Sequence, residues 1–303
     1  MKPPRFDYLA PATVDEALGL LAQHGDQAKV LAGGQSLVPL LNFRLVRPAH
    51  IVDLNELTGL DGIREEGGWL VIGGMTRQRA VEDSALVRER CPLLAAAMPH
   101  IGHTQIRNRG TVGGSIAHAD PAAELPAVVA ALGGELVAQS KGATRTLKSD
   151  TFFVSYLTSA LEPTELLVQV RLPVVPARTG VSFMEVSRRH GDFALVGVAA
   201  TLTLDGGGVC TASAVALTGV GPTPVLAREA VAPLVGAQPT PEIFEEVGRR
   251  VSASLTPDSD LHASSEYRKH VGGVLTRRAL AEALSRAQGG AGSTNGHAKG
   301  AGR

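Results

Sequence analysis

The spacing of apolar residues alternates between helical and extended patterns in the first part of the chain. Residues 13–16 have the Ser/Thr-x-x-Glu form of a capping box, and apolar residues then recur near helical spacing until Gly25, which predicts a helix over 13–24. A polar turn is expected over 61–68. Short apolar runs predict strands over 28–32, 51–54 and 69–72, so helices and strands are interleaved in an α/β pattern.

The next part of the chain contains helices, strands and one irregular segment. The segment 101–115 is rich in Gly, Asn and Thr, which predicts a loop rather than a long regular element. Residues 173–176 are proline-rich and predict a domain boundary or a crossing linker. Helical patterns cover 77–83, 86–98 and 122–132, and strand patterns cover 135–138 and 166–172.

The last part of the chain has the pattern of a small sheet backed by helices. Three strand candidates with Gly-rich turns between them predict an antiparallel meander over 181–188, 194–204 and 211–217. Helical periodicity then covers 241–255 and 266–286, which makes this an α+β domain. Residues 288–303 are mostly Gly, Ala, Ser and Asn, and we expect a disordered tail there.

Composition and charge narrow the function classes. The chain has 303 residues, a formal net charge of zero and only 4% aromatic residues, so we expect no nucleic-acid partner. The first residues lack the apolar segment of a secretory signal, and the charge-free stretch 206–227 is broken by Gly, Ser, Thr and two prolines. We therefore expect a cytoplasmic protein without a membrane span, in which Cys91 and Cys210 are free thiols.

Two Gly-Gly segments are the main candidates for chemistry. Ala32-Gly33-Gly34-Gln35-Ser36 and Thr111-Val112-Gly113-Gly114-Ser115 each offer consecutive backbone N–H groups that can surround phosphate oxygens. Gly-Gly pairs also occur at several other places in the chain, where they indicate turns, so either pair alone is weak evidence. Neither segment has the spacing of a dinucleotide fingerprint or a P-loop.

Two carboxylates follow the second segment. Asp120 is placed to cap a helix that starts near Pro121, while Glu124 falls in the first turn of that helix. Either carboxylate could instead accept hydrogen bonds from sugar hydroxyls. His100 and His103 lack a third ligand at metal-site spacing, so we expect no metal. Two cysteines cannot supply the four ligands of an iron–sulfur cluster, so any cluster must belong to another chain.

The two glycine segments and their surroundings together indicate a family. From residue 6 to about residue 287 the chain closely resembles the FAD-binding medium subunits of molybdenum hydroxylases, such as those of aerobic carbon monoxide dehydrogenase and the flavin domain of xanthine dehydrogenase. The residues that carry the resemblance are 30–37, 44–54, 110–116, 120–121, 165–167 and 188–193.

The resemblance implies an α+β fold with two parts. The first is a two-lobed FAD-binding domain of the PCMH (vanillyl-alcohol oxidase-like) type over 1–175, with lobes of about 1–57 and 58–175. The second is a C-terminal α+β domain over 176–287, with an antiparallel sheet and helices, that covers the flavin.

The resemblance also assigns residues to the cofactor. The FAD pyrophosphate is expected on both glycine segments and the ribityl or ribose hydroxyls on Glu124, with Asp120 as second choice. Ile101 is expected near the nucleotide, Leu166 and Leu167 beside the flavin, and Phe193 near its ring. The full cofactor-binding set is Ala32, Gly33, Gly34, Gln35, Ser36, Leu37, Ile101, Thr111, Val112, Gly113, Gly114, Ser115, His118, Asp120, Glu124, Leu166, Leu167 and Phe193.

The implied activity is that of an electron-transfer subunit without catalytic side chains of its own. In this family a large subunit holds the molybdenum cofactor and a small subunit holds two [2Fe–2S] clusters; FAD passes their electrons to an acceptor, within a dimer of heterotrimers. Two alternatives are a self-sufficient FAD-dependent oxidase or reductase and a scaffold that no longer exchanges electrons. Many relatives have a lysine in the strand before Arg188-Arg189, where this chain has Glu185, which implies a difference in flavin tuning or in the choice of acceptor.

Overall fold

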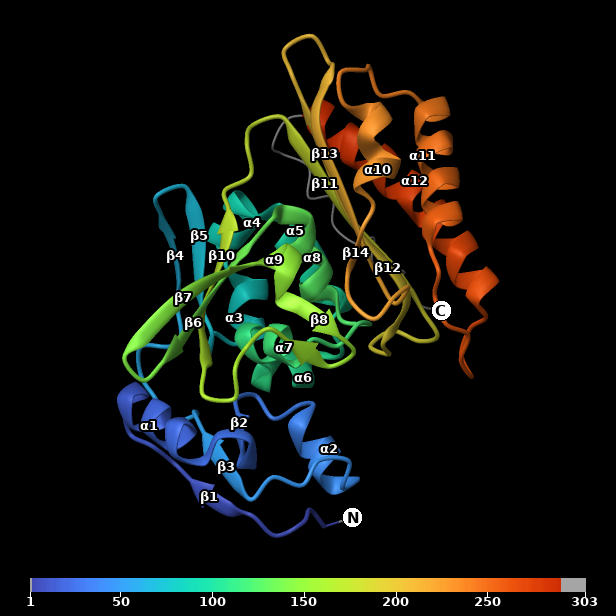
Figure 1. The fold of residues 1–303 in the computed structure, drawn as a ribbon. Coiled ribbons are helices and arrows are strands. Elements are labelled where there is room, and N and C mark those ends of the chain that lie inside the picture. The colour runs from blue at the N-terminus through green and yellow to red at the C-terminus, as the bar shows by residue number, and fades with distance from the viewer. Residues whose placement is uncertain (1, 290–303) are drawn as a thin grey trace, which may run out of the picture.

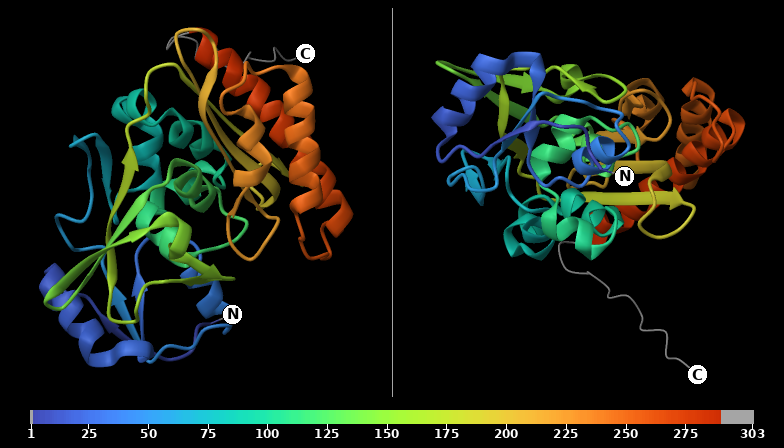
Figure 2. Two further views of the ribbon diagram at one scale, coloured as in Figure 1. Left: turned by 45° about the horizontal axis from the view of Figure 1, so that its top comes forward. Right: turned by 90° about the horizontal axis from the view of Figure 1, so that it is seen from below.

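The computed structural model describes residues 2–289. A layer of helices lies between a five-stranded and a four-stranded sheet, and a smaller three-stranded unit lies at one end of the molecule (Figure 1). Two helices, α11 (Pro241–Ser254) and α12 (Ser265–Gly289), cover the outer face of the four-stranded sheet (Figure 2). The chain is therefore α+β, with its helices and sheets in alternating layers.

The N-terminal unit is a parallel sheet with two helices. Its strands have the order β1 (Asp7–Leu9), β3 (His50–Asp53) and β2 (Ala28–Leu31), and its helices are α1 (Val14–His24) and α2 (Leu37–Asn42), with a 3₁₀ turn η1 (Gly25–Gln27) between α1 and β2. The hydroxyl of Thr13 accepts a hydrogen bond from the Glu16 amide at 3.2 Å, which caps α1 as predicted. The buried face of α1 packs, together with β3, against Val137, Leu166 and Val168 of the next sheet.

The five-stranded sheet is antiparallel throughout. Its order is β4 (Ile63–Glu66), β5 (Trp69–Gly73), β10 (Leu166–Pro173), β6 (Glu135–Ser140) and β7 (Ala143–Lys148). The predicted polar turn 61–68 is wrong in part, because it contains β4, and β7 had no sequence signal. Both are edge strands whose side chains are largely exposed, so they carry no apolar pattern in the sequence. They are extended because their backbones pair with a buried neighbouring strand.

A β-bulge in β10 connects two cores. Leu166 and Val168 belong to the cluster beside α1, whereas Val170 and Leu172 belong to the central cluster on the opposite face. The register shifts between Leu167 and Gln169, and such a shift moves the following side chains to the other face of the sheet.

The helical layer is more broken than the sequence predicted. The expected helix 86–98 is interrupted at Cys91, because Pro92 has no N–H and can only begin a new helix. The expected loop 101–115 contains two short helices instead. The layer consists of α3 (Gln78–Asp83), α4 (Ala85–Arg90), α5 (Pro92–Ala97), η2 (Met98–His100), α6 (Thr104–Arg109), α7 (Val112–His118), α8 (Glu124–Leu132) and α9 (Ser149–Phe152), followed by the hairpin β8 (Phe153–Ser155) and β9 (Thr158–Ser159).

The C-terminal part is the predicted antiparallel meander with helices behind it. Its strand order is β11 (Thr179–Ser187), β12 (Ala194–Leu204), β13 (Cys210–Thr218) and β14 (Val225–Leu226). The short α10 (Arg228–Val231) and η3 (Ala232–Leu234) precede α11. Within the described residues no helix is both long and apolar enough to cross a membrane. Of the predicted tail, residues 288 and 289 end α12 and the remainder lies outside the described residues.

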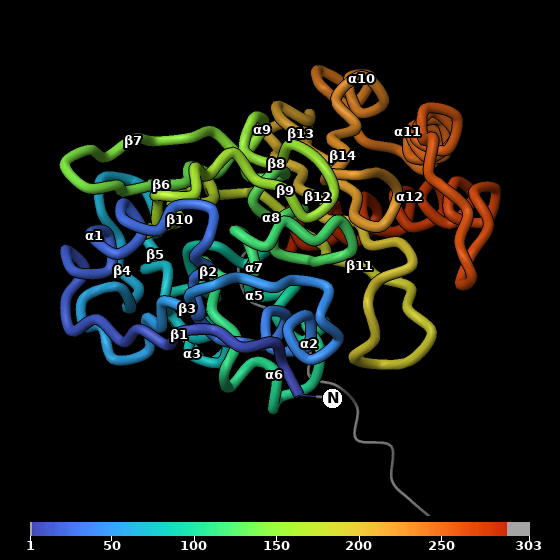
Figure 3. The backbone as a smooth tube through the Cα atoms, turned by 60° about the horizontal axis from the view of Figure 1, so that its bottom comes forward, coloured from blue at the N-terminus to red at the C-terminus, as the bar shows by residue number. Residues whose placement is uncertain are grey.

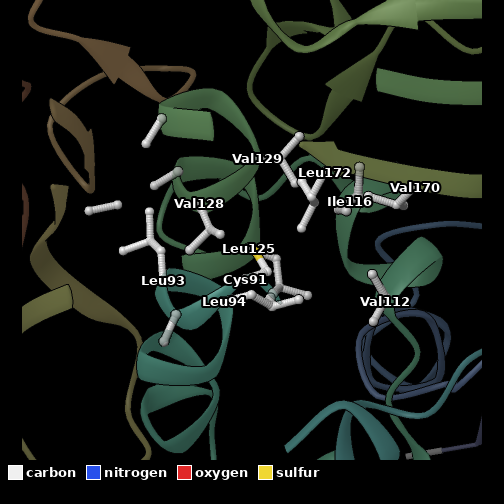
Figure 4. Packing of buried hydrophobic residues seen from close by; sticks show 14 of the residues in the cluster. Cys91, Leu93, Leu94, Val112, Ile116, Leu125, Val128, Val129, Val170 and Leu172 are labelled. Atoms are coloured by element: carbon white, nitrogen blue, oxygen red, sulfur yellow. The ribbon is translucent and has the colours of Figure 1, made fainter. Parts of the chain in front are cut away.

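The central core joins the helical layer to both large sheets. Figure 4 shows side chains from α5, α7 and α8 meeting Val170 and Leu172 of β10. Val181, Phe183, Ala199 and Ala216 of the four-stranded sheet belong to the same buried cluster. The C-terminal sheet is thus packed against the helical layer by continuous apolar contact.

Candidate cofactor site

The two glycine segments of the sequence lie against each other. A Cβ atom added to Gly33 would lie 2.5 Å from the backbone oxygen of Arg109, and one added to Gly114 would lie 3.4 Å from the Cβ of Ala32. The start of α2 is accordingly found beside α6 in Figure 3. We name residues 32–36 the first motif and residues 111–115 the second motif. Their contact places two distant stretches of sequence in one site.

The first motif is a turn with free amides. Gly34 has a φ of +75°, a conformation that residues other than glycine rarely adopt. The Gln35 side-chain amide donates to the Gly33 carbonyl at 3.1 Å. Within the described part of the chain, the backbone amides of Gly33, Gly34, Gln35 and Ser36 donate to no protein acceptor. Such consecutive free N–H groups form a concave site that suits an anion.

The second motif has a different structure. It is the capped start of α7: the Thr111 hydroxyl accepts from the Gly114 amide at 3.1 Å. The amide of Gly113 donates to the Gly74 carbonyl at 2.9 Å, and the amide of Val112 to that of Thr76 at 3.0 Å. The expectation that both motifs offer free amides is therefore wrong for the second, because the N–H groups of residues 112–115 already have partners inside the protein.

A polar network that the sequence did not indicate joins the two motifs. The side-chain amide of Asn55 donates to the Ala32 carbonyl at 3.0 Å, and Arg77 donates to the Asn55 side-chain oxygen at 2.7 Å. Arg77 also donates to the carbonyl of Arg109, beside the second motif. Burial lowers the pKa of Arg77, although the group stays charged. Asn55 directly follows the strand-like run 51–54, so the signal was a polar residue at a strand end.

The two carboxylates near α8 differ in role and burial. An oxygen of Asp120 accepts from the Ala122 amide at 2.8 Å, which makes a turn before the helix. The prediction that Asp120 caps a helix starting near Pro121 is thus wrong, since α8 begins at Glu124. Glu124 is only 6% exposed, and burial raises the pKa of its carboxyl to about 7. Burial of a carboxyl without a cationic partner leaves it available to hydroxyl donors.

The apolar candidates lie in different surroundings. Leu167 contacts Gly74, whose added Cβ would lie 2.1 Å from the Leu167 carbonyl oxygen, so Leu166 and Leu167 are brought beside the second motif. Ile101 is buried in the central core. Phe193 is 69% exposed at the end of the loop after β11. His118 ends α7, and burial lowers its pKa.

The C-terminal sheet docks onto the turn that leads into α8. The hydroxyl of Thr218 lies 2.6 Å from the Pro121 carbonyl oxygen and 2.9 Å from that of Ala123, and the Gly219 amide donates to Pro121 at 2.8 Å. The loop after β11 approaches α6, where Gly191 lies against the His103 ring. Residues of the C-terminal sheet therefore face the start of α8, close to Glu124.

The remaining metal and thiol candidates have apolar or aromatic surroundings. Cys91 and Cys210 are buried free thiols, as predicted. The ring of His100 lies 5.1 Å from that of Phe183, and the ring of His103 lies 5.7 Å from that of His190. Residues 2–289 contain no group of three or more His, Cys, Asp or Glu side chains that could hold a metal ion.

The class of the protein follows from two matching family models. Residues 4–175 match the "FAD binding domain in molybdopterin dehydrogenase", and residues 181–283 match the "CO dehydrogenase flavoprotein C-terminal domain". Together the two matches cover most of the chain. The protein belongs to the FAD-binding medium subunits of molybdopterin dehydrogenases, an oxidoreductase flavoprotein family, which confirms the resemblance seen in the sequence.

Individual relatives are similar over nearly their whole length. The chain is 42% identical to the 6-hydroxypseudooxynicotine dehydrogenase complex subunit alpha of Paenarthrobacter nicotinovorans, covering 95% of this chain and 97% of that protein. It is 38% identical to the carbon monoxide dehydrogenase medium chain of Hydrogenophaga pseudoflava, covering 94% and 99%. A solved structure of carbon monoxide dehydrogenase from that organism superimposes with a TM-score of 0.91 at 39% identity, over 94% of this chain and 99% of the other.

Proposed function

We propose that this chain binds FAD non-covalently, with the pyrophosphate on the free amides of the first motif. The observation that carries the proposal is the run of four unpaired N–H groups at Gly33 to Ser36, in a turn that a positive φ at Gly34 makes possible. Four convergent donors suit a doubly charged pyrophosphate. The second motif packs against this turn, where Gly114 lies next to Ala32.

The rest of the cofactor extends from the first motif toward the C-terminal sheet. Glu124 accepts hydrogen bonds from ribityl or ribose hydroxyls, because it is buried, forms no ion pair within residues 2–289 and lies where the two parts of the molecule meet. Leu167 and Phe193 are apolar groups available to the ring, whereas Leu166 is buried in the cluster beside α1 and would support them from within the protein. When bound, FAD supplies the redox chemistry, and these residues bind it, orient it and limit its contact with water.

The chain is proposed to act as the electron outlet of a complex. Its two cysteines are too few to ligate an iron–sulfur cluster, so in this proposal the electrons come from a cluster on another chain. The relatives named above include a subunit of a dehydrogenase complex and a medium chain. We infer a small [2Fe–2S] subunit and a large molybdenum-cofactor subunit as partners, in a cytoplasmic dimer of heterotrimers.

A direct binding experiment tests the cofactor site. The purified full chain is titrated with FAD by calorimetry and visible absorbance, and one FAD per chain is expected. Gly34→Ala forces a Cβ into a positive-φ position, which costs roughly 1–2 kcal/mol, and disturbs the amide turn, so FAD affinity should fall. Gly142→Ala is the matched control: Gly142 also has a positive φ, +84°, but nothing lies within 4 Å of its added Cβ. Equal FAD affinity of the two variants would show that the first motif is not the site.

A second experiment tests the role in a complex. The FAD-loaded chain alone should be reduced by dithionite but should not oxidise aldehydes, heterocycles or carbon monoxide. Expressed together with a small iron–sulfur and a large molybdenum subunit, it should co-purify and support turnover with an artificial acceptor. Substrate oxidation by the isolated chain would instead favour the self-sufficient flavin oxidase, and a flavin that dithionite cannot reduce would favour a scaffold.

A further inference from the structure

We propose that Glu185 sets the reduction potential of the bound flavin, because its buried carboxyl stands on the face of the C-terminal sheet that is turned toward the start of α8, where Glu124 belongs to the proposed FAD site. The proposal rests on the proposed FAD site and adds a residue to it. Glu185 matches no predicted cofactor contact, and its position was notable in the sequence only because many relatives have a lysine nearby.

The sheet register places Glu185 toward the start of α8. Glu185 pairs with Gly197 across β11 and β12, and Gly197 pairs with Thr218 across β12 and β13. Directly paired residues of a sheet point to the same face. Thr218 bonds the carbonyls of Pro121 and Ala123, just before Glu124, so Glu185 faces that same region.

The absence of a side chain at Gly197 leaves room for Glu185. A Cβ added to Gly197 would lie 2.7 Å from the methyl carbon of Thr218, 3.6 Å from the Phe183 ring and 3.8 Å from the Cγ of Glu185. The Glu185 side chain therefore passes beside Gly197, in space that a larger residue at position 197 would fill.

One oxygen of Glu185 has no partner. Its Oε2 atom is buried and forms no hydrogen bond within residues 2–289. A buried carboxyl oxygen without a partner is costly unless the group is neutral or a ligand supplies the missing contact. Burial, with a smaller contribution from Glu124, accordingly raises the pKa of Glu185 to about 8.

The charged groups around this position do not neutralise Glu185. Glu124 and Asp120 are acidic, and burial lowers the pKa of His100, whose ring lies against Phe183. Arg107 binds Glu82 through two hydrogen bonds, at 2.8 and 2.9 Å, and is not available to Glu185. The loop after β11 adds Arg188, His190 and Asp192, of which Arg188 lies 3.8 Å from Asp192.

The electrostatic consequence for the flavin has a definite sign. Two-electron reduction of FAD takes up protons from water and leaves the ring negative when only one proton is bound. An ionised Glu185 nearby repels that negative charge and lowers the potential, while a neutral Glu185 does not. Reduction in turn favours protonation of Glu185, so around pH 8 the reduced protein takes up extra proton and the potential falls more steeply with pH.

The test measures the midpoint potential of the FAD-loaded full chain between pH 6 and pH 10. For the wild type we expect an additional downward bend in the potential around pH 8. Glu185→Gln keeps the volume without the charge, so its potential should match the wild type at pH 6, exceed it above pH 9 and lack the bend. Glu185→Lys should raise the potential at every pH. Glu229→Gln is the control: Glu229 lies on α10, whose buried residues pack at the other face of the sheet, and its curve should follow the wild type.

The outcomes separate the two proposals. If the wild type binds FAD but shows no bend, or if the Glu185→Gln curve coincides with the wild-type curve, Glu185 does not tune the flavin and the FAD site stands. If the bend disappears in Glu124→Gln at saturating FAD but persists in Glu185→Gln, the titrating carboxyl is Glu124 and the proposal is wrong. If the wild type binds no FAD, the proposed function itself fails.

Discussion

The two glycine motifs are nearly alike in sequence and serve different purposes in the fold. Each has Gly-Gly followed within two residues by serine, and in each the first glycine permits a close approach of two backbones: Gly33 to Arg109 and Gly113 to Gly74. Only the first motif combines a positive φ with free amides. The second motif has used its amides to begin α7 and to bond Gly74 and Thr76.

This difference shows that the hydrogen-bonding state of a glycine pair cannot be deduced from the pair itself. Backbone N–H groups in a turn are available only if no neighbouring segment supplies a carbonyl. The Gly73–Thr76 segment supplies carbonyls to the second motif, whereas the first motif meets side chains and the Arg109 carbonyl but no acceptor for its amides. The first motif is therefore the proposed binding element, and the second motif is its support.

The largest expected effect is on stability, and it tests whether the second motif holds the site together. Gly113→Ala would place a Cβ 2.6 Å from the Gly74 oxygen and 2.7 Å from its Cα, so backbone must move. We expect a loss of about 3 kcal/mol in the free energy of unfolding of the FAD-free chain, near the top of the usual range for overpacking. Chemical denaturation measures it. Unchanged stability would mean that the second motif does not hold the site together.

A smaller effect, on FAD affinity, is expected when Glu124, the buried carboxyl that follows the second motif, is replaced. Glu124→Ala should weaken FAD binding by about 2 kcal/mol, within the range for hydrogen bonds to a charged group, and Glu124→Gln should cost less. Calorimetric titration measures the affinity. Asp120→Ala is the comparison variant; a larger loss there than in Glu124→Ala would transfer the sugar-binding role to Asp120.

The next effect is expected at Asn55, which links the two motifs. Asn55→Ala removes the contact with the Ala32 carbonyl and leaves Arg77 without one acceptor. Stability should fall by about 1.5 kcal/mol, because a partly buried polar group loses its partner. The amide turn should also be less ordered, so FAD affinity should fall with it. Hydrogen exchange in α12 distinguishes a local loosening of the turn, which leaves α12 protected, from general unfolding, which would accelerate exchange there as well.

A further effect is a pH dependence of the stability of the FAD-free chain. The pKa values of Glu124 and Glu185 are raised to about 7 and about 8, from an ordinary 4.5. The folded state therefore holds more protons than the unfolded state, and this stabilisation, fully present below about pH 4.5, is lost as the pH rises through those values. Tm should fall between pH 7 and pH 9, where His100 and His118 are already neutral. A Tm that rises over this range, or one that falls equally in a Glu124→Gln, Glu185→Gln double variant, contradicts the assignment.

Much of the architecture followed from local patterns. The capping box at 13–16, the meander of β11 to β13 and the two long C-terminal helices were each visible, because strong periodicity and capping residues act over a few neighbouring positions. Only the family resemblance connected the two motifs with FAD, since composition excluded classes of partner but identified none.

The failures have a common physical cause. The edge strands β4 and β7 and the short helices α6 and α7 carry weak local signals, and neighbouring segments stabilise them. The Arg107 side chain, for instance, bonds the Ile101 and Gly102 carbonyls and fixes the segment before α6.

By itself the sequence determined the element types with strong periodicity, the positions of flexible glycines and the family. The tertiary structure alone decided which glycine motif keeps its amides free, how Asn55 and Arg77 join the motifs, and that Glu185 lies on the sheet face turned toward the start of α8. These are contacts between residues far apart in the chain, and no local pattern encodes them because a polar group's partner, burial and charge state depend on which distant segment packs against it.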